Sequence, residues 1–158
     1  MDMHICILEA GKPGEALLYK HGSYGRMIEH WLGPALPEAR FSAIDLWSGQ
    51  PLPEDCSGFD AFVVSGSKAG VYEDYPWIAP LISFLREVRV QRRPLAGICF
   101  GHQVMAQAFG GVAEKADTGW ILGRNRHTLT PAGQTLFGKT ALWALSIHQD
   151  QVTGVPDG

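Results

Sequence analysis

The spacing of apolar residues changes along the chain and separates segments that predict strands from segments that predict helices. Residues 4–8 form a short apolar run before glycine and proline, which predicts a buried first strand. Between residues 23 and 32, apolar side chains recur every three or four positions, which predicts a helix. Ser23 is its candidate N-cap, and Gly33-Pro34 would end it. Residues 41–47 predict a second strand.

The middle of the chain continues this alternation. Residues 59–64 predict a third strand that ends in the small-residue turn Ser65-Gly66-Ser67. Pro76 suits the first position of a second helix, whose apolar stripe extends to Val88. Residues 94–99 then predict a fourth, short strand.

The last third of the chain follows a different pattern. Residues 102–109 predict a helix that ends at Gly110-Gly111. Residues 111–115, 121–130 and 141–147 then predict strands without helices between them. Because strands first alternate with helices, we expect an α/β fold with a doubly wound, mainly parallel sheet and a small antiparallel extension. No internal repeat or linker is evident, so residues 1–158 are expected to form one domain.

Composition and charge exclude several classes of function. Of the 158 residues, 46% are hydrophobic and 18% are charged, so a packed core is expected. The net charge of −3 gives no electrostatic basis for binding nucleic acid or acidic membranes. No apolar run approaches the roughly 18–20 residues that span a bilayer, and the first residues lack the features of a signal peptide. We therefore expect a cytoplasmic protein that binds neither nucleic acid nor membranes.

The three cysteines predict neither a disulfide framework nor a metal site. Their odd number and wide spacing argue against bridges, and no C-x-x-C pair is present. Cys6 lies within an apolar run and is expected to be a small buried residue. Cys56 lies in a loop rich in proline, glycine and polar residues, and we expect no role for it. No pattern in the sequence predicts a cofactor.

The third cysteine lies in a motif with a chemical interpretation. Gly97-Ile98-Cys99-Phe100-Gly101 has the G-x-nucleophile-x-G form of a nucleophile elbow, a sharp turn between a strand and a helix. Such a turn carries Cys99 clear of the sheet in a strained conformation and places it at a helix N-terminus, where the dipole favours the thiolate. The backbone N–H of Phe100 would then face a developing oxyanion.

The alternative is a buried cysteine in a glycine-rich turn, and this motif by itself would favour that interpretation. Two further observations favour a nucleophile. The motif follows the fourth strand, at the carboxyl edge of the sheet where such folds bind ligands. It also continues into His102-Gln103.

The string from Gly97 to Gln103, GICFGHQ, resembles the nucleophile motif of class I glutamine amidotransferase domains, and in particular a stand-alone branch that includes γ-glutamyl peptidases. Two other strings are similar to this branch. They are FVVSGS at residues 62–67, followed by VYEDYPWI at residues 71–78, and IHQDQV at residues 147–152. The three strings occur in the family's order and extend over essentially the whole chain. The resemblance implies a flavodoxin-like fold of the amidotransferase type.

The resemblance also implies roles for individual residues. Cys99 would attack a γ-glutamyl amide and form a thioester, which water hydrolyses to glutamate. Backbone N–H groups of Gly66 or Ser67, together with that of Phe100, would hold the oxyanion.

The substrate's amino-acid end would be bound by three residues: Gln103, His148 and Gln149. His102 is close to Cys99 in sequence, but we expect its ring to turn into the fold and to have a structural role.

One expected element of the family is missing from the sequence. The family takes its histidine base from a late H-x-E string, and no H-x-E occurs in the 158 residues. The sequence ends at Val155-Pro156-Asp157-Gly158, before the point where the resemblance places that string and the closing strand and helix. The domain is therefore expected to be incomplete at its C-terminus, and these residues alone to show little or no turnover.

Several functions remain open at this stage. The first is glutaminase-type hydrolysis, with a possible synthase subunit as acceptor of the ammonia. The second is a γ-glutamyl peptidase, and the third is a non-catalytic domain that binds and regulates a partner. A nucleotide-binding role is disfavoured because neither G-x-G-x-x-G nor G-x-x-x-x-G-K-[ST] is present. An α/β-hydrolase shares the elbow but usually has serine as its nucleophile.

Overall fold

The structure is a computed structural model that describes residues 3–156. The first two residues and the last two of the chain lie outside the described range. The described residues divide into two compact units: residues 3–114 together with 152–156, and residues 115–151. No helix within residues 3–156 is long and apolar enough to cross a membrane.

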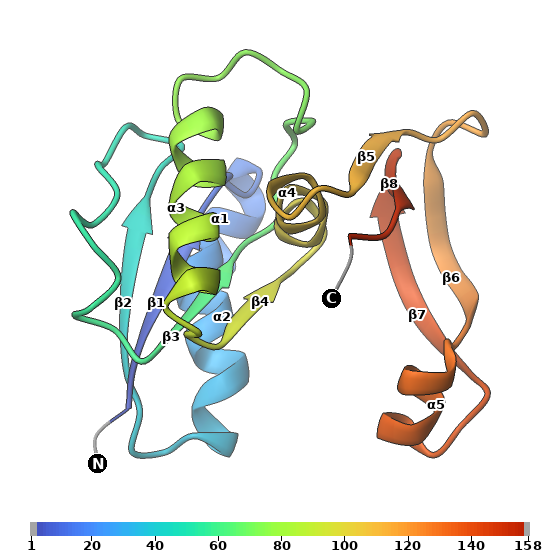
Figure 1. The fold of residues 1–158 in the computed structure, drawn as a ribbon, viewed down its shortest axis with the longest axis horizontal. Helices are drawn as coiled ribbons and strands as arrows, with labels where there is room; N and C mark the ends of the chain where they lie inside the picture. Colours follow the sequence, from blue (N-terminus) through green and yellow to red (C-terminus); the bar gives the residue numbers. More distant parts are fainter. Residues whose placement is uncertain (1–2, 157–158) are drawn as a thin grey trace. The chain divides into compact units, whose positions relative to one another are not determined.

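The first unit is built on a four-stranded parallel sheet (Figure 1). Its strands are β1 (His4–Glu9), β2 (Arg40–Asp45), β3 (Ala61–Val64) and β4 (Leu95–Gly97), in the spatial order β2-β1-β3-β4. Every neighbouring pair is parallel. The predicted parallel sheet is confirmed, and its central strands β1 and β3 are the most completely buried.

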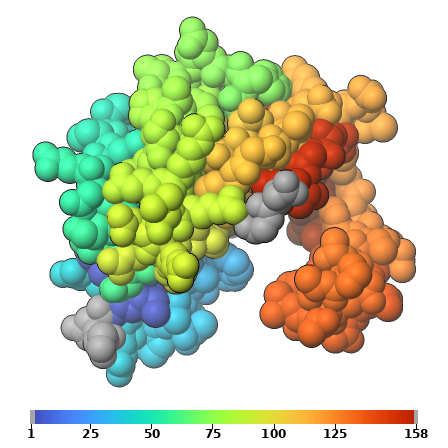
Figure 2. All heavy atoms as spheres, in the orientation of Figure 1, coloured from blue at the N-terminus to red at the C-terminus, as the bar shows by residue number. Residues whose placement is uncertain are grey.

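Helices cover both faces of this sheet, because alternate side chains of each strand point to opposite sides. Cys6 and Leu8 pack in the cluster that includes α3 (Ile78–Val90) and α4 (Phe100–Ala108). Ile5 and Ile7 pack in a second cluster with Ile28 of α2 (Tyr24–Leu32). Figure 2 shows the side chains of α3, in yellow-green, covering the sheet on the side of the viewer.

The helices of the first unit partly match the predictions. The helix predicted over residues 23–32 is confirmed, with the Ser23 hydroxyl accepting a hydrogen bond from the N–H of Arg26. A short helix before it, α1 (Glu15–His21), was not predicted. It contains no buried residue, so no apolar stripe marks it in the sequence. A single turn of 3-10 helix, Gly33–Ala35, follows α2.

The prediction that Pro76 opens the second helix is wrong, because α3 begins at Ile78. The N–H of Ile78 donates to the carbonyl oxygen of Tyr75, so Tyr75, Pro76 and Trp77 form a turn that leads into the helix. The next helix, α4, begins at Phe100, two residues before its predicted start.

The remaining strands are β5 (Val112–Lys115), β6 (Ile121–Thr128), β7 (Ala141–His148) and β8 (Asp150–Gly154). β6 and β7 form an antiparallel pair in the second unit, as predicted, and β5 pairs with β8. The expectation of no helix between these strands is wrong, because α5 (Pro131–Phe137) joins β6 to β7. The Thr130 hydroxyl caps α5 by accepting from the N–H of Gly133, and Gly138 ends it in the left-handed conformation.

Candidate active site at the nucleophile elbow

Cys99 lies in the turn that joins β4 to α4, and its backbone is strained. Its φ of 54° and ψ of −106° fall outside the regions that residues with a side chain ordinarily occupy. The only other described non-glycine residue with positive φ is Arg92. The side chain of Cys99 is exposed to solvent. The strained, outward-facing turn that the G-x-C-x-G motif predicts at Cys99 is therefore confirmed.

The turn requires glycine at both flanking positions of the motif, because a β-carbon there would clash with neighbouring backbone atoms. A β-carbon on Gly97 would lie 2.6 Å from the backbone nitrogen of His102 and closer still to the carbonyl carbon of Gly101. A β-carbon on Gly101 would collide with the carbonyl oxygen of Val64 at the end of β3. The helix is thus packed directly against the strand beside it, which fixes the position of Cys99.

The loop after β3 lies next to Cys99. A β-carbon on Gly66 would be 3.7 Å from that of Cys99, an ordinary van der Waals distance. The hydroxyl of Ser65 is buried, accepts a hydrogen bond of 2.9 Å from the N–H of Ala10 and donates one of 2.9 Å to the carbonyl of Gly66. Ser67 accepts from the N–H of Ala69 through its own hydroxyl. These bonds hold the Gly66 backbone beside the nucleophile, where an oxyanion donor is expected.

Phe100 and Gln103 are both anchored on α4. The Phe100 ring is fully buried and meets the ring of Trp77 edge to face, with centroids 5.5 Å apart. This contact fixes the first residue of the helix, whose backbone N–H is the second candidate oxyanion donor. The side chain of Gln103 is only 5% exposed, and its backbone N–H donates to the carbonyl of Cys99 at 3.1 Å.

The expectation that His102 turns into the fold is wrong, because His102 is exposed. The buried positions of α4 are Phe100, Gly101, Gln103 and Val104, followed by Ala106 and Ala108. His102 therefore lies on the opposite face of the helix from this buried set. The side chain that turns inward next to it is that of Gln103.

His148 and Gln149, the other residues predicted to bind substrate, lie in the second unit at the end of β7. A ring nitrogen of His148, Nδ1, lies 2.8 Å from the carbonyl oxygen of Asp150. The carbonyl of Gln149 accepts a hydrogen bond from the N–H of Ala116. These contacts order the turn between β7 and β8, and the binding role of both residues stays a prediction.

Sequence reasoning missed Tyr24, the first residue of α2. The pKa of its phenol is raised by burial and, second, by the negative charge of the nearby Cys99 thiolate. The helix that carries Tyr24 is tied to the end of β1, because the buried carboxylate of Glu9 accepts a hydrogen bond from the N–H of Gly25. In the sequence Tyr24 looked like one residue of an apolar helical stripe, and no local signal linked it to Cys99.

The other two cysteines are buried and differ from Cys99 in this respect. Cys6 is a core residue, as predicted, and burial raises the pKa of its thiol to about 12. Cys56, which lies in a loop where the sequence suggested no role, is 2% exposed and belongs to the main core cluster. Burial and then the charge of Glu87 raise the pKa of the Cys56 thiol. Cys99 is thus the accessible thiol of the chain.

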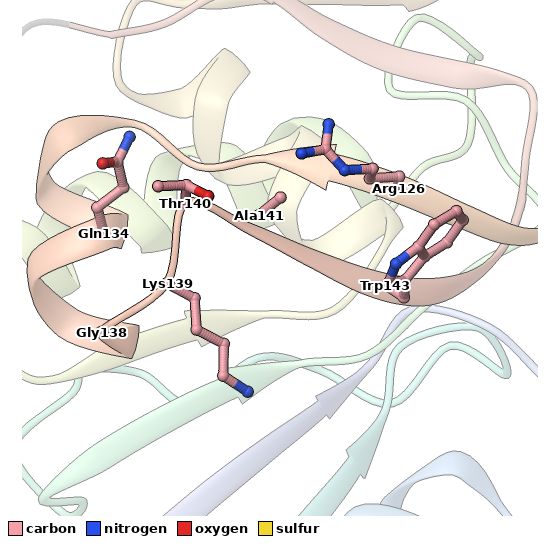
Figure 3. A pocket seen from close by; sticks show the side chains of 7 residues that line it. All are labelled: Arg126, Gln134, Gly138, Lys139, Thr140, Ala141 and Trp143. Carbon is pink, nitrogen blue, oxygen red and sulfur yellow. The ribbon is translucent and has the colours of Figure 1, made fainter.

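A separate hollow of about 660 Å³ lies in the second unit (Figure 3). It is lined by side chains of β6, α5, β7 and the turn between α5 and β7. Among them are Arg126 of β6, Lys139 of the turn and Trp143 of β7. None of the predicted site residues lines it. Within residues 3–156, no group of three or more histidine, cysteine or acidic side chains is placed to hold a metal ion.

Comparison with known families confirms the family resemblance seen in the sequence. The family model described as glutamine amidotransferase class-I matches residues 23–157, most of the chain. The chain belongs to the class-I glutamine amidotransferase family. An amidotransferase-like protein of Schizosaccharomyces pombe is 31% identical over 169 residues, which cover 100% of this chain and 68% of that protein. Gamma-glutamyl peptidase 5 of Arabidopsis thaliana is 32% identical over 115 residues, which cover 68% of this chain and 45% of that one.

The fold is also shared with solved structures of the amidotransferase family. The glutamine amidotransferase of Methylobacillus flagellatus superposes with a TM-score of 0.76 at 21% identity, over 99% of this chain and 58% of that one. The likeness shows the common flavodoxin-like fold. The chain spans between 45% and 68% of the length of these three amidotransferase relatives.

Proposed function

We propose that this chain carries the nucleophile of an amidotransferase-type hydrolase, with Cys99 attacking the carbonyl carbon of a γ-glutamyl amide. A bond forms between the Cys99 sulfur and that carbon, and the carbon–nitrogen bond then breaks as the nitrogen takes up a proton. Ammonia or an amine leaves, and a γ-glutamyl thioester remains. Water attacks the thioester, releases glutamate and restores the thiol.

The residues around Cys99 have distinct tasks in this proposal. The N–H of Phe100 and an N–H of Gly66 or Ser67 donate to the oxyanion of each tetrahedral intermediate. Gln103, on α4 of the first unit, binds the amino-acid end of the substrate. The single observation that carries the proposal is the strained, exposed position of Cys99 beside the Gly66 loop.

A covalent probe tests the nucleophile without requiring turnover. No H-x-E string occurs in the 158 residues, so we expect an activated analogue to react with the chain far faster than an amide is hydrolysed. The probe is the diazoketone analogue of glutamine, which alkylates a thiol with loss of dinitrogen. We expect one adduct per chain, at Cys99, in peptide mass spectra. An excess of glutamine should slow its formation, and Cys99→Ser should abolish it.

The proposal fails if the adduct forms on Cys6 or Cys56 instead, or if glutamine gives no protection. Cys56→Ser serves as the matched control, because Cys56 is a buried thiol and its loss should leave labelling of Cys99 unchanged. An absence of any adduct at Cys99 would favour a non-catalytic role in which the domain binds and regulates a synthase subunit.

A γ-glutamyl peptidase is the second candidate, because the 32% identity to Gamma-glutamyl peptidase 5 covers 68% of the chain. The two activities differ in the leaving group, which is ammonia for a glutaminase and an amino acid or peptide for a peptidase. Release of ammonia from glutamine should be compared with release of glycine from γ-glutamylglycine. A synthase subunit as acceptor of ammonia belongs to the first candidate alone.

A further inference from the structure

A hollow of about 390 Å³ lies in the first unit at the carboxyl edge of the parallel sheet. Its lining includes two lysines, Lys12 from the loop after β1 and Lys68 from the loop after β3. Trp47, which follows β2, forms an apolar wall, and Leu18 and Glu15 of α1 contribute the rest of the larger side chains. The size suits part of a small ligand.

This hollow adjoins the loop that lies beside Cys99. Lys12 directly follows Gly11, and a β-carbon on Gly11 would lie 2.8 Å from both the carbonyl oxygen of Gly66 and the Cα of Ser67. Lys68 directly follows Ser67. The two loops that carry the lysines are therefore in contact at the residues expected to supply an oxyanion donor.

Aromatic contacts connect the wall of the hollow to the elbow. The ring of Trp47 lies 6.2 Å from that of Trp77, and Trp77 meets the buried ring of Phe100 at 5.5 Å. Tyr75 also packs against Trp47, at 5.3 Å. Because these rings form one packed cluster, the position of Trp47 is set relative to the first residue of α4.

The charge of the hollow favours an anion. Lys12 and Lys68 are both exposed, and within residues 3–156 neither lies within 4.0 Å of a carboxylate as an ion pair. Glu15 lines the same hollow and offsets one of the two positive charges. The remaining positive charge and the lysine N–H donors match a carboxylate group.

We propose that Lys12 and Lys68 bind a carboxylate of the γ-glutamyl substrate in this hollow, with Trp47 as its apolar wall. This inference rests on the proposed function of Cys99. The carboxylate belongs either to the leaving group, as in a γ-glutamyl amino acid, or to the glutamyl group itself. Both sources present the same carboxylate group to the lysines. They are distinguished by comparing a ligand that has a leaving-group carboxylate with one that lacks it.

Protection of Cys99 from iodoacetamide tests the lysine pair on the full chain. Cys99 is the exposed cysteine, so its alkylation can be followed by mass spectrometry of its peptide while the buried thiols react slowly. Each ligand slows this alkylation in proportion to its occupancy. The ligands are γ-glutamylglycine, which carries a leaving-group carboxylate, and γ-glutamylethylamide, which lacks it. The variants are Lys12→Gln, Lys68→Gln and the double substitution, measured at low salt.

We expect the double variant to need several-fold, and at most about 25-fold, more γ-glutamylglycine for half-protection, because two exposed ion pairs are lost and each contributes up to about a factor of five in affinity. Lys20→Gln is the matched control, since Lys20 is an exposed lysine of α1 that does not line the hollow. The double arginine variant, Lys12→Arg with Lys68→Arg, should retain protection because it keeps both charges.

The ligands then identify the source of the carboxylate. If the double variant loses protection of Cys99 by γ-glutamylglycine only, the lysines bind the carboxylate of the leaving group. If it loses protection by γ-glutamylethylamide to the same extent, they bind the glutamyl carboxylate. Undiminished protection in the double variant overturns the lysine subsite and leaves the proposed function standing. If no γ-glutamyl compound protects wild-type Cys99, the proposed function fails and the subsite fails with it.

Discussion

The phenol of Tyr24 lies within the electrostatic influence of Cys99, although the two residues are 75 positions apart in the sequence. Burial is the larger cause of the raised pKa of Tyr24, and the charge of the Cys99 thiolate is the second. Tyr24 is the first residue of α2, whereas Cys99 lies between β4 and α4. The thiol therefore lies near a tyrosine that stays protonated beyond the pH at which an exposed tyrosine ionises.

This relationship predicts a measurable shift in the titration of Tyr24. In Cys99→Ser the side chain is neutral at alkaline pH, so the pKa of Tyr24 should fall towards its ordinary value, with the burial contribution remaining. The pKa can be followed by NMR of protein labelled with ¹³C at the tyrosine ring carbons. An unchanged Tyr24 titration would contradict the proximity of the two groups.

Gly101→Ala should destabilise the first unit, although alanine favours a helix. In an exposed helix this change would stabilise by about 1 kcal/mol. Here the new β-carbon collides with the carbonyl oxygen of Val64, and overpacking of this kind costs about 1–3 kcal/mol. Urea denaturation measures the free energy of unfolding. Gly58→Ala is the control, because no atom lies within 4 Å of its added β-carbon and the change should be nearly neutral.

Ser65→Ala should both destabilise the chain and loosen the loop beside Cys99. The substitution leaves the N–H of Ala10 and the carbonyl of Gly66 without their partner in a buried site, at a cost of about 1–3 kcal/mol. Denaturation measures the first effect, and hydrogen exchange of the loop amides measures the second. Ser83→Ala, on the exposed side of α3, should change neither quantity. Equal stability of the two variants would show that the Ser65 bridge contributes little.

The free energy of unfolding should decrease at alkaline pH partly because of Cys6. Burial raises the pKa of this thiol from 9.0 to about 12, so above pH 9 the unfolded chain loses a proton that the folded chain keeps. Stability from this group is fully present below pH 9 and is lost as the pH rises towards 12, by roughly 1.4 kcal/mol per pH unit. Cys6→Ala should be less stable at neutral pH but show a shallower alkaline slope. Parallel slopes for the two proteins would be inconsistent with the raised pKa.

Much of the fold was predictable because the signals for it are local. The four parallel strands are short apolar runs between turn residues, and α2 follows its Ser23 cap. The turn at Cys99 was predictable for the same reason, since one glycine two positions before it and another two positions after it specify a tight strand-to-helix connection. The sequence also contained the signals for α5, namely Thr130, Pro131 and Gly138, although the strand pattern on either side obscured them.

Tertiary packing decided what local patterns could not. The face of α4 that turns inward depends on where the helix begins, and a start at Phe100 exposes His102 and buries Gln103. Cys56 is buried because its loop packs against α3, which composition does not reveal. The sequence by itself determined the strands, the capped helix and the strained cysteine, because neighbouring residues dictate backbone conformation. Only the tertiary structure brought Tyr24 to Cys99, and Lys12 to Lys68, because parallel strands carry the ends of distant segments to one edge of a sheet.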